Sequence, residues 1–226
     1  MPAMTTLKPF AAVVFDMDGT LLDTELVFKE VVWDVSRSLG FTMTEAIHLG
    51  MIGTSHEASR ALLVESYGVS FPIELFDSEC ARIMTARMQQ AVPVKAGVRE
   101  FLKELKDRRL PIAVATSSRT KSATVNLGLA GIFDQFDAVI TRDDVVNPKP
   151  HPEPYLLAAR KLRAPPAECL AIEDSHAGVR SAHAAGMQTL MVPDLIQPTD
   201  EIRALCHAVM DSLHHVRAAA FATEVA

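Results

Sequence analysis

Short apolar runs alternate along the chain with longer segments in which apolar residues recur every three to four positions. The short runs predict strands, and several of them are apolar throughout, as expected for strands covered on both faces of a sheet. We expect strands at residues 11–15, 112–116, 138–141, 170–173 and 189–192, with a weaker one at 208–210.

The longer segments predict amphipathic helices between these strands, at residues 97–109, 120–127, 154–162 and 177–185. Gly186 follows the last of them, where glycine commonly ends a helix. Strands that alternate with helices indicate an α/β fold, here a Rossmann-like parallel sheet wrapped by helices. The C-terminal segment 216–226 is expected to fray.

Residues 25–91 break this alternation. The segments 25–40, 55–68 and 74–90 read as amphipathic helices with no strand between them, so we expect an inserted four-helix module. Pro93 is a plausible hinge for the return of the chain. We therefore predict an α/β core of residues 1–22 and 94–226 and a helical insertion of residues 23–93.

Composition narrows the classes of function. The chain has 226 residues, a hydrophobic content of 49% and a formal net charge of −6, which argues against binding nucleic acid through a basic face. Its three cysteines are scattered without metal-site or disulfide spacing, which favours a reducing compartment. We find no signal peptide and no apolar run of ~20 residues that could span a membrane. We expect a cytoplasmic protein, and we expect it to be a monomer.

Polar residues follow the predicted strands. Each alone has an ordinary explanation: a turn, a helix N-cap or a solvated charge. Parallel strands, however, bring their carboxyl ends to one edge of a sheet, where ligands bind. That edge would collect Asp16, Asp18, Thr116, Ser117, Lys149, Glu173 and Asp174.

This set of side chains has a definite chemistry. Carboxylates in one cleft repel one another unless a cation neutralises them, and a set of oxygen ligands points to Mg²⁺. A lysine and a hydroxyl nearby would bind the oxygens of a phosphoryl group. The sequence therefore predicts a site for Mg²⁺ and a phosphorylated ligand.

The segments "DMDGTLLD", "ATSS", "KPHPEP" and "EDSHAGVRSAHAAGM" resemble, in order and spacing, the motifs of the haloacid dehalogenase-like (HAD) hydrolases. The helical insertion resembles the four-helix cap of the subgroup that contains β-phosphoglucomutase and small sugar-phosphate phosphatases. "VATSSR" and "AAGMQTLMVPD" are most similar to members of the pseudouridine-5′-phosphatase type.

The resemblance implies a mechanism. Asp16 would be the nucleophile that forms an aspartyl-phosphate, and Asp18 would protonate the leaving alcohol and then deprotonate water. Mg²⁺ would bind the Asp16 carboxylate, the Asp18 carbonyl and Asp174. For Glu173 two roles stay open: a metal ligand that acts through water, or a group that supports the other ligands.

The phosphoryl group would be held by Thr116, Ser117 and Lys149, and Gly19 would let the backbone approach it. Substrate choice would fall to the cap. The candidates there are Glu25, Lys29, Trp33, His56 and Arg60; Glu25, directly behind the first motif, is the best, and Trp33 fits the cap core better than a substrate contact.

The resemblance alone does not distinguish a phosphatase from a mutase. β-Phosphoglucomutase-like relatives use a histidine and an arginine in the cap, but these positions fall at Phe28 and near His56. We therefore expect an Mg²⁺-dependent phosphatase of a small phosphomonoester, either a sugar phosphate or a nucleotide-type monophosphate. The alternatives are a phosphoryl-transfer isomerase and, less favoured, a binding protein without activity. The scattered histidines, His176 and His183 among them, lack the pattern of a zinc site.

Overall fold

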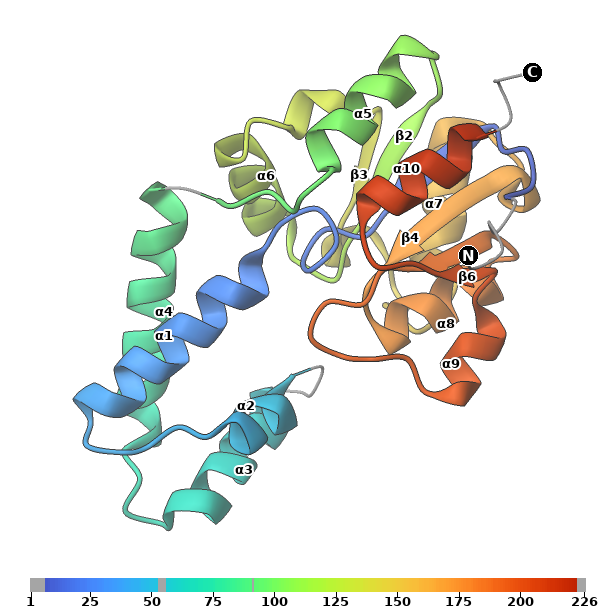
Figure 1. Cartoon of the computed structure of the whole chain (residues 1–226). Coiled ribbons are helices and arrows are strands. Elements are labelled where there is room, and N and C mark those ends of the chain that lie inside the picture. Colours follow the sequence, from blue (N-terminus) through green and yellow to red (C-terminus); the bar gives the residue numbers. More distant parts are fainter. Residues whose placement is uncertain (1–6, 53–55, 91, 223–226) are drawn as a thin grey trace. The chain divides into compact units, whose positions relative to one another are not determined.

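The computed structural model describes residues 7–52, 56–90 and 92–222 (Figure 1). Contacts within the chain divide it into two compact units: Met1–Leu22 with Pro93–Ala226, and Asp23–Val92. We call them the α/β unit and the helical unit. These boundaries differ from the predicted domain boundaries by one residue at the return of the chain; the role of the helical unit as a cap stays a prediction.

The α/β unit contains a six-stranded sheet in the order β3-β2-β1-β4-β5-β6, and every neighbouring pair is parallel. The predicted parallel α/β fold is confirmed. Each predicted strand is present, and its ends differ by at most one residue from β1 Ala12–Phe15, β2 Ile112–Ala115, β3 Ala138–Ile140, β4 Cys169–Glu173, β5 Gln188–Met191 and β6 Ala208–Val209.

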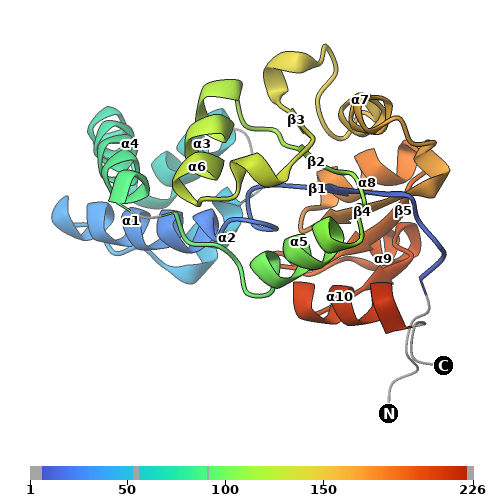
Figure 2. The ribbon, with the colours of Figure 1, turned by 90° about the horizontal axis from the view of Figure 1, so that it is seen from above.

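Helices cover both faces of the sheet, with α7 on one face and α5 and α10 on the other (Figure 2). Side chains alternate accordingly: Val14 joins the apolar cluster beneath α7, whereas the ring of Phe15 packs edge-on against Phe101 of α5 at 5.6 Å. The helices of this unit are α5 Val98–Asp107, α6 Thr120–Leu129, α7 Glu153–Leu162, α8 His176–Ala184, α9 Asp200–Leu205 and α10 Leu213–Phe221, with short 3₁₀ turns η1 Phe133–Gln135, η2 Arg142–Asp144 and η3 Pro166–Glu168.

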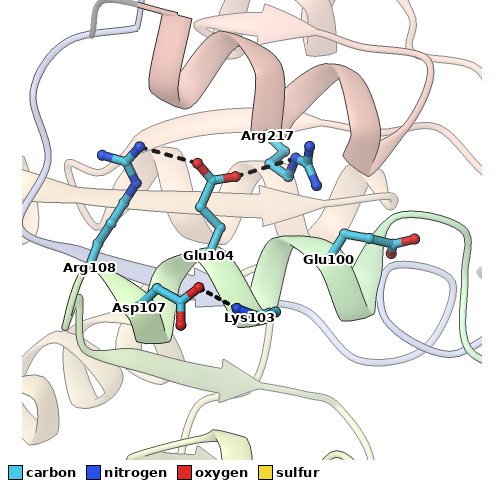
Figure 3. A pocket seen from close by; sticks show the side chains of 6 residues that line it. All are labelled: Glu100, Lys103, Glu104, Asp107, Arg108 and Arg217. Carbon is cyan, nitrogen blue, oxygen red and sulfur yellow. Dashed lines mark hydrogen bonds and ion pairs between the residues drawn. The ribbon is translucent and has the colours of Figure 1, made fainter.

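We expected the chain to fray from residue 216. This is wrong for residues 216–221, because they belong to α10, which packs against α5. Val216 is fully buried, and the Phe221 ring lies 6.1 Å from that of Phe101. A surface hollow of about 470 Å³ lies between these two helices. Glu104 of α5 pairs there with Arg108 and with Arg217 of α10 (Figure 3). The pair of Glu104 with Arg217 therefore links the two helices at the surface, in addition to their apolar packing.

The helical unit consists of α1 Thr24–Ser38, α2 Glu45–Met51, α3 His56–Tyr67 and α4 Ile73–Gln90. The three helices predicted by periodicity are confirmed as α1, α3 and α4, and α2 is the fourth. Arg87 of α4 joins α1 through Glu30 and Asp34 at 2.8 and 2.5 Å. Among the described residues, no helix combines the length and apolar character needed to cross a membrane.

Candidate active site

The central strand β1 delivers Asp16 to the carboxyl edge of the sheet, between β2 and β4. The Asp16 N–H donates to the Ile172 carbonyl at 2.9 Å, so the sheet's hydrogen bonding continues as far as this aspartate. On the other side of β1, Thr116 directly follows β2, and its N–H donates to the Ile140 carbonyl at 2.8 Å. The backbone therefore brings the ends of β1, β2 and β4 to one edge of the sheet, as the sequence predicts.

Lys149 links two of the carboxylates. Its Nζ lies 2.5 Å from Oδ1 of Asp16 and 2.5 Å from Oε1 of Glu173. The lysine side chain is only 4% exposed, so both ion pairs lie away from bulk water. Burial alone lowers the pKa of Lys149, but Asp16 and Glu173 more than offset this and raise it overall. Lys149 is therefore a permanently charged ammonium.

The loop that carries Lys149 is fixed by hydrogen bonds on both sides. The Glu153 carboxylate, at the start of α7, accepts from the N–H groups of Val146 and Asn147, each at 2.9 Å. Ser181 of α8 donates to the His151 carbonyl at 2.6 Å. The lysine thus comes from a loop, but one that two helices hold in place.

Glu173 is fully buried at the end of β4, and both of its oxygens are occupied. Oε1 accepts from Lys149 and from the Tyr155 hydroxyl at 2.6 Å; Oε2 accepts from the Ser175 hydroxyl at 3.1 Å. Gly178 of α8 also leaves no spare room, because a Cβ there would lie 1.8 Å from Oε1. This arrangement favours the role of a group that supports Lys149 over that of a metal ligand.

Asp174, the next residue, lies against the turn that follows Asp16. A Cβ at Gly19 would come within 2.2 Å of its Oδ2, and Gly19 has a φ of +84°. Only glycine meets both conditions without strain. The Gly19 amide itself donates to the Leu22 carbonyl at 2.9 Å, so its expected role in binding phosphate stays a prediction.

Asp18 is oriented by a residue that the sequence analysis missed. The Ser118 hydroxyl donates to Asp18 Oδ2 at 2.8 Å, and the Ser118 N–H donates to Thr116 Oγ1 at 3.0 Å. The predicted pair of hydroxyls was Thr116 and Ser117. Ser117 is exposed, so its contact with phosphate stays a prediction, as does that of the buried Thr116.

Burial, and after it the neighbouring carboxylates, oppose the charged forms of Asp16 and Asp174. Burial raises the pKa of Asp16 well above its ordinary value; Lys149 opposes this rise, and Glu173 adds to it. Burial likewise raises the pKa of Asp174, and the charges of Asp16 and Glu173 raise it further. The charge of Lys149 therefore offsets only part of what opposes the ionised forms of these carboxylates.

This donor set fits a divalent cation. Oxygens of Asp16, Glu173 and Asp174 lie within 4.8 Å of one another, the only such group of acidic, histidine or cysteine side chains in the part of the chain that the structure describes. All the ligands are oxygens, as Mg²⁺ prefers. Since Glu173 is already engaged by Lys149, Tyr155 and Ser175, Asp16 and Asp174 would be the carboxylates available to a cation, and their binding of Mg²⁺ stays a prediction.

The residues predicted to select the substrate belong to the helical unit, and their contacts with a substrate stay a prediction. The side chain of Glu25 is not among the described residues, so its role stays a prediction. Lys29 pairs with Glu45 at 2.8 Å, and Arg60 pairs with Asp77 at 2.8 Å. Trp33 packs in the core of the helical unit, as expected.

Two of the histidines without a zinc-site pattern, His176 and His183, contact backbone carbonyl groups. His176 Nε2 lies 3.0 Å from the Gln197 carbonyl, and His183 Nδ1 lies 3.0 Å from the Leu205 carbonyl. Both rings thus bind backbone oxygens on the side of α8 that meets α9.

Known proteins are similar to this chain in both sequence and fold. Residues 13–192 match the family described as haloacid dehalogenase-like hydrolase. The "Phosphorylated carbohydrates phosphatase" of Thermotoga maritima is 32% identical over 179 residues, which cover 79% of this chain and 83% of that protein. A Drosophila melanogaster protein named "Probable pseudouridine-5'-phosphatase" is 31% identical over 198 residues, 85% of each chain.

Among solved structures, a HAD family hydrolase from Deinococcus radiodurans with bound phosphate and sodium has the same fold. Its TM-score is 0.83 at 27% identity, and the match covers 93% of this chain and 95% of that one. The relatives that are named phosphatases confirm the predicted enzyme class. The motifs, the fold and the family match agree: the chain belongs to the haloacid dehalogenase-like hydrolases.

Proposed function

We propose that the protein is an Mg²⁺-dependent phosphatase that hydrolyses a small phosphomonoester through an aspartyl-phosphate on Asp16. The observation that carries this proposal is the buried contact of the Asp16 carboxylate with Lys149, 2.5 Å away, in one cluster with Asp174. A carboxylate nucleophile needs a neighbouring cation to approach an anionic phosphate, and this cluster supplies one ammonium and the ligands for Mg²⁺.

In the first half of the reaction, the Asp16 carboxylate attacks phosphorus and the bond from phosphorus to the ester oxygen breaks. Asp18 gives its proton to the leaving alcohol. Ser118 supports this step by fixing one oxygen of Asp18, with a hydrogen bond of 2.8 Å. Lys149 and Thr116 hold the phosphoryl oxygens.

In the second half, Asp18 takes a proton from water, which attacks the aspartyl-phosphate and frees Asp16 and inorganic phosphate. When bound, Mg²⁺ would be held by Asp16 and Asp174 and would neutralise charge between the nucleophile and the phosphate. Lys149 stays charged throughout, because Asp16 and Glu173 raise its pKa despite burial.

The substrate class that we propose is a phosphorylated sugar or a nucleotide-type monophosphate. It is supported by the two relatives whose names refer to phosphorylated carbohydrates and to pseudouridine 5′-phosphate. The isomerase alternative has less support: Phe28 packs within the core of the helical unit, and His56 lies 3.3 Å from Asp77.

The test is the substitution Asp16→Asn, which keeps the shape of the side chain and removes its charge. We expect release of phosphate from sugar phosphates to fall by at least about 10³-fold, because the nucleophile is lost. The control is Asp107→Asn, an exposed aspartate in an ion pair with Lys103, which should keep wild-type rates. Wild-type activity in Asp16→Asn, with folding confirmed by circular dichroism, would overturn the assignment of the nucleophile.

A further inference from the structure

Tyr155 is a fully buried side chain of α7 that the mechanism above does not use. Its hydroxyl donates to Oε1 of Glu173 at 2.6 Å. The same oxygen accepts from Lys149 Nζ at 2.5 Å, and this ammonium lies 5.2 Å from the centre of the tyrosine ring. Tyr155 therefore contacts both members of the Glu173–Lys149 ion pair.

Lys149 lies between two carboxylates that compete for it. Its Nζ is 2.5 Å from Asp16 and 2.5 Å from Glu173, so small differences in charge decide which partner attracts it more. A hydroxyl that donates to a carboxylate oxygen offsets part of its negative charge. Tyr155 does this on the oxygen that Lys149 itself contacts.

We propose that Tyr155 is a positioning residue that weakens the hold of Glu173 on Lys149 and so keeps the ammonium available to Asp16 and to a phosphoryl group. The inference rests on the proposed function, since it concerns the lysine of that site. Without the hydroxyl, Glu173 would attract Lys149 more strongly, and the ammonium would bind the phosphoryl oxygens less well.

Tyr155 is better placed to weaken the Glu173–Lys149 contact than Ser175, the other hydroxyl that contacts Glu173. Ser175 donates to Oε2 of Glu173, the oxygen that Lys149 does not contact. A purely structural role is the competing explanation, because a buried hydroxyl needs a partner. The two explanations differ in what removal of the hydroxyl does to phosphate binding.

The experiment compares wild type with Tyr155→Phe in the full chain, with Mg²⁺ present throughout. We expect the affinity for inorganic phosphate, measured by calorimetry, to fall about tenfold and KM to rise by a similar factor, with a smaller change in kcat. The control is Tyr67→Phe, which removes the chain's other tyrosine hydroxyl, bound to the Thr42 carbonyl at 2.9 Å. It should leave phosphate affinity and KM unchanged.

A double substitution tests whether Tyr155 acts through the charge of Glu173. In a Glu173→Gln background, Tyr155→Phe should change phosphate affinity by less than about twofold, because the competing charge is already gone. An unchanged phosphate affinity in folded Tyr155→Phe, or the same tenfold loss in both backgrounds, would overturn the inference. If the wild-type protein neither binds phosphate nor releases it from esters, the proposed function fails, and the inference fails with it.

Discussion

At the scale of single residues, hydrogen bonds favour one of the two roles that the sequence leaves open for Glu173, that of a group supporting Lys149. Both of its oxygens are engaged by Lys149, Tyr155 and Ser175, and the side chain is fully buried. A carboxylate whose two oxygens both accept hydrogen bonds in this way is suited to hold Lys149 in place. In the function that we propose, Asp16 and Asp174 are then the carboxylates that bind the cation.

Because Glu173 is packed this closely, we expect a substitution of Gly178 to have a large effect on stability and activity. A Cβ there would lie 1.8 Å from Glu173 Oε1 and 1.9 Å from its Cδ, so Gly178→Ala must displace a carboxylate that is held on three sides. We expect the free energy of unfolding to fall by about 2–4 kcal/mol, and phosphatase activity to be lost as Lys149 shifts.

The matched control is Gly128→Ala in α6, where an added Cβ meets no atom within 4 Å. It should raise stability by up to about 1 kcal/mol, because alanine favours a helix, and leave activity unchanged. Urea unfolding and phosphate release measure both variants. Equal effects of the two substitutions would contradict this account of Gly178.

The sequence predicted the site residues that directly follow a strand, because parallel strands collect their ends at one edge. Asp16, directly after β1, and Glu173, the last residue of β4, come together as that rule requires, and Lys149 reaches them from the loop before α7. Tyr155 and Ser118 could not be predicted in the same way. Tyr155 reads as an apolar position of an amphipathic helix, and only the fold shows that its hydroxyl reaches Glu173.

At the scale of elements, strands that are apolar throughout were predictable to within one residue, whereas short helices were not. The helix α9 has six residues, too few for a periodic pattern to stand out, and α10 depends on packing with α5. In the helical unit, α2 is also short, yet it carries His48, which is fully buried.

The environment of His48 predicts a pH dependence. Neither ring nitrogen has a hydrogen-bond partner among the residues that the structure describes, and the ring packs against Trp33 at 5.0 Å. Burial lowers the pKa of His48 below 6.5, with Lys29 adding to the effect. Below pH ~6.5 the unfolded chain therefore binds the proton more readily than the folded one, and stability falls as the pH falls, by at most about 1.4 kcal/mol per pH unit.

The chain's single tryptophan, Trp33, provides the measurement, because its fluorescence reports on the unfolding of the helical unit. Between pH 7.5 and 5.5, wild type should lose stability against urea. His48→Leu, which keeps an apolar side chain of similar size, should lose less, since other titrating groups are common to both proteins. If the stability of the wild type and of His48→Leu fell equally with pH, this would contradict the role given to His48.

At the scale of the whole molecule, the sheet gathers acidic groups that the fold alone does not neutralise. Asp16 and Asp174 have raised pKa values because burial and neighbouring carboxylates oppose their charge. Lys149 supplies one positive charge, and a bound divalent cation would supply the rest. Activity should therefore depend on Mg²⁺.

The most direct test of the central claim is phosphate release from a panel of phosphomonoesters, with Mg²⁺ and with excess chelator. The panel includes hexose phosphates, phosphoglycolate and pseudouridine monophosphate. The account predicts release that requires Mg²⁺ and favours a sugar phosphate or a nucleotide-type monophosphate. Release that persists in chelator would contradict the role of the cation. No release from any ester, together with conversion of β-glucose 1-phosphate to an isomer, would contradict the phosphatase assignment.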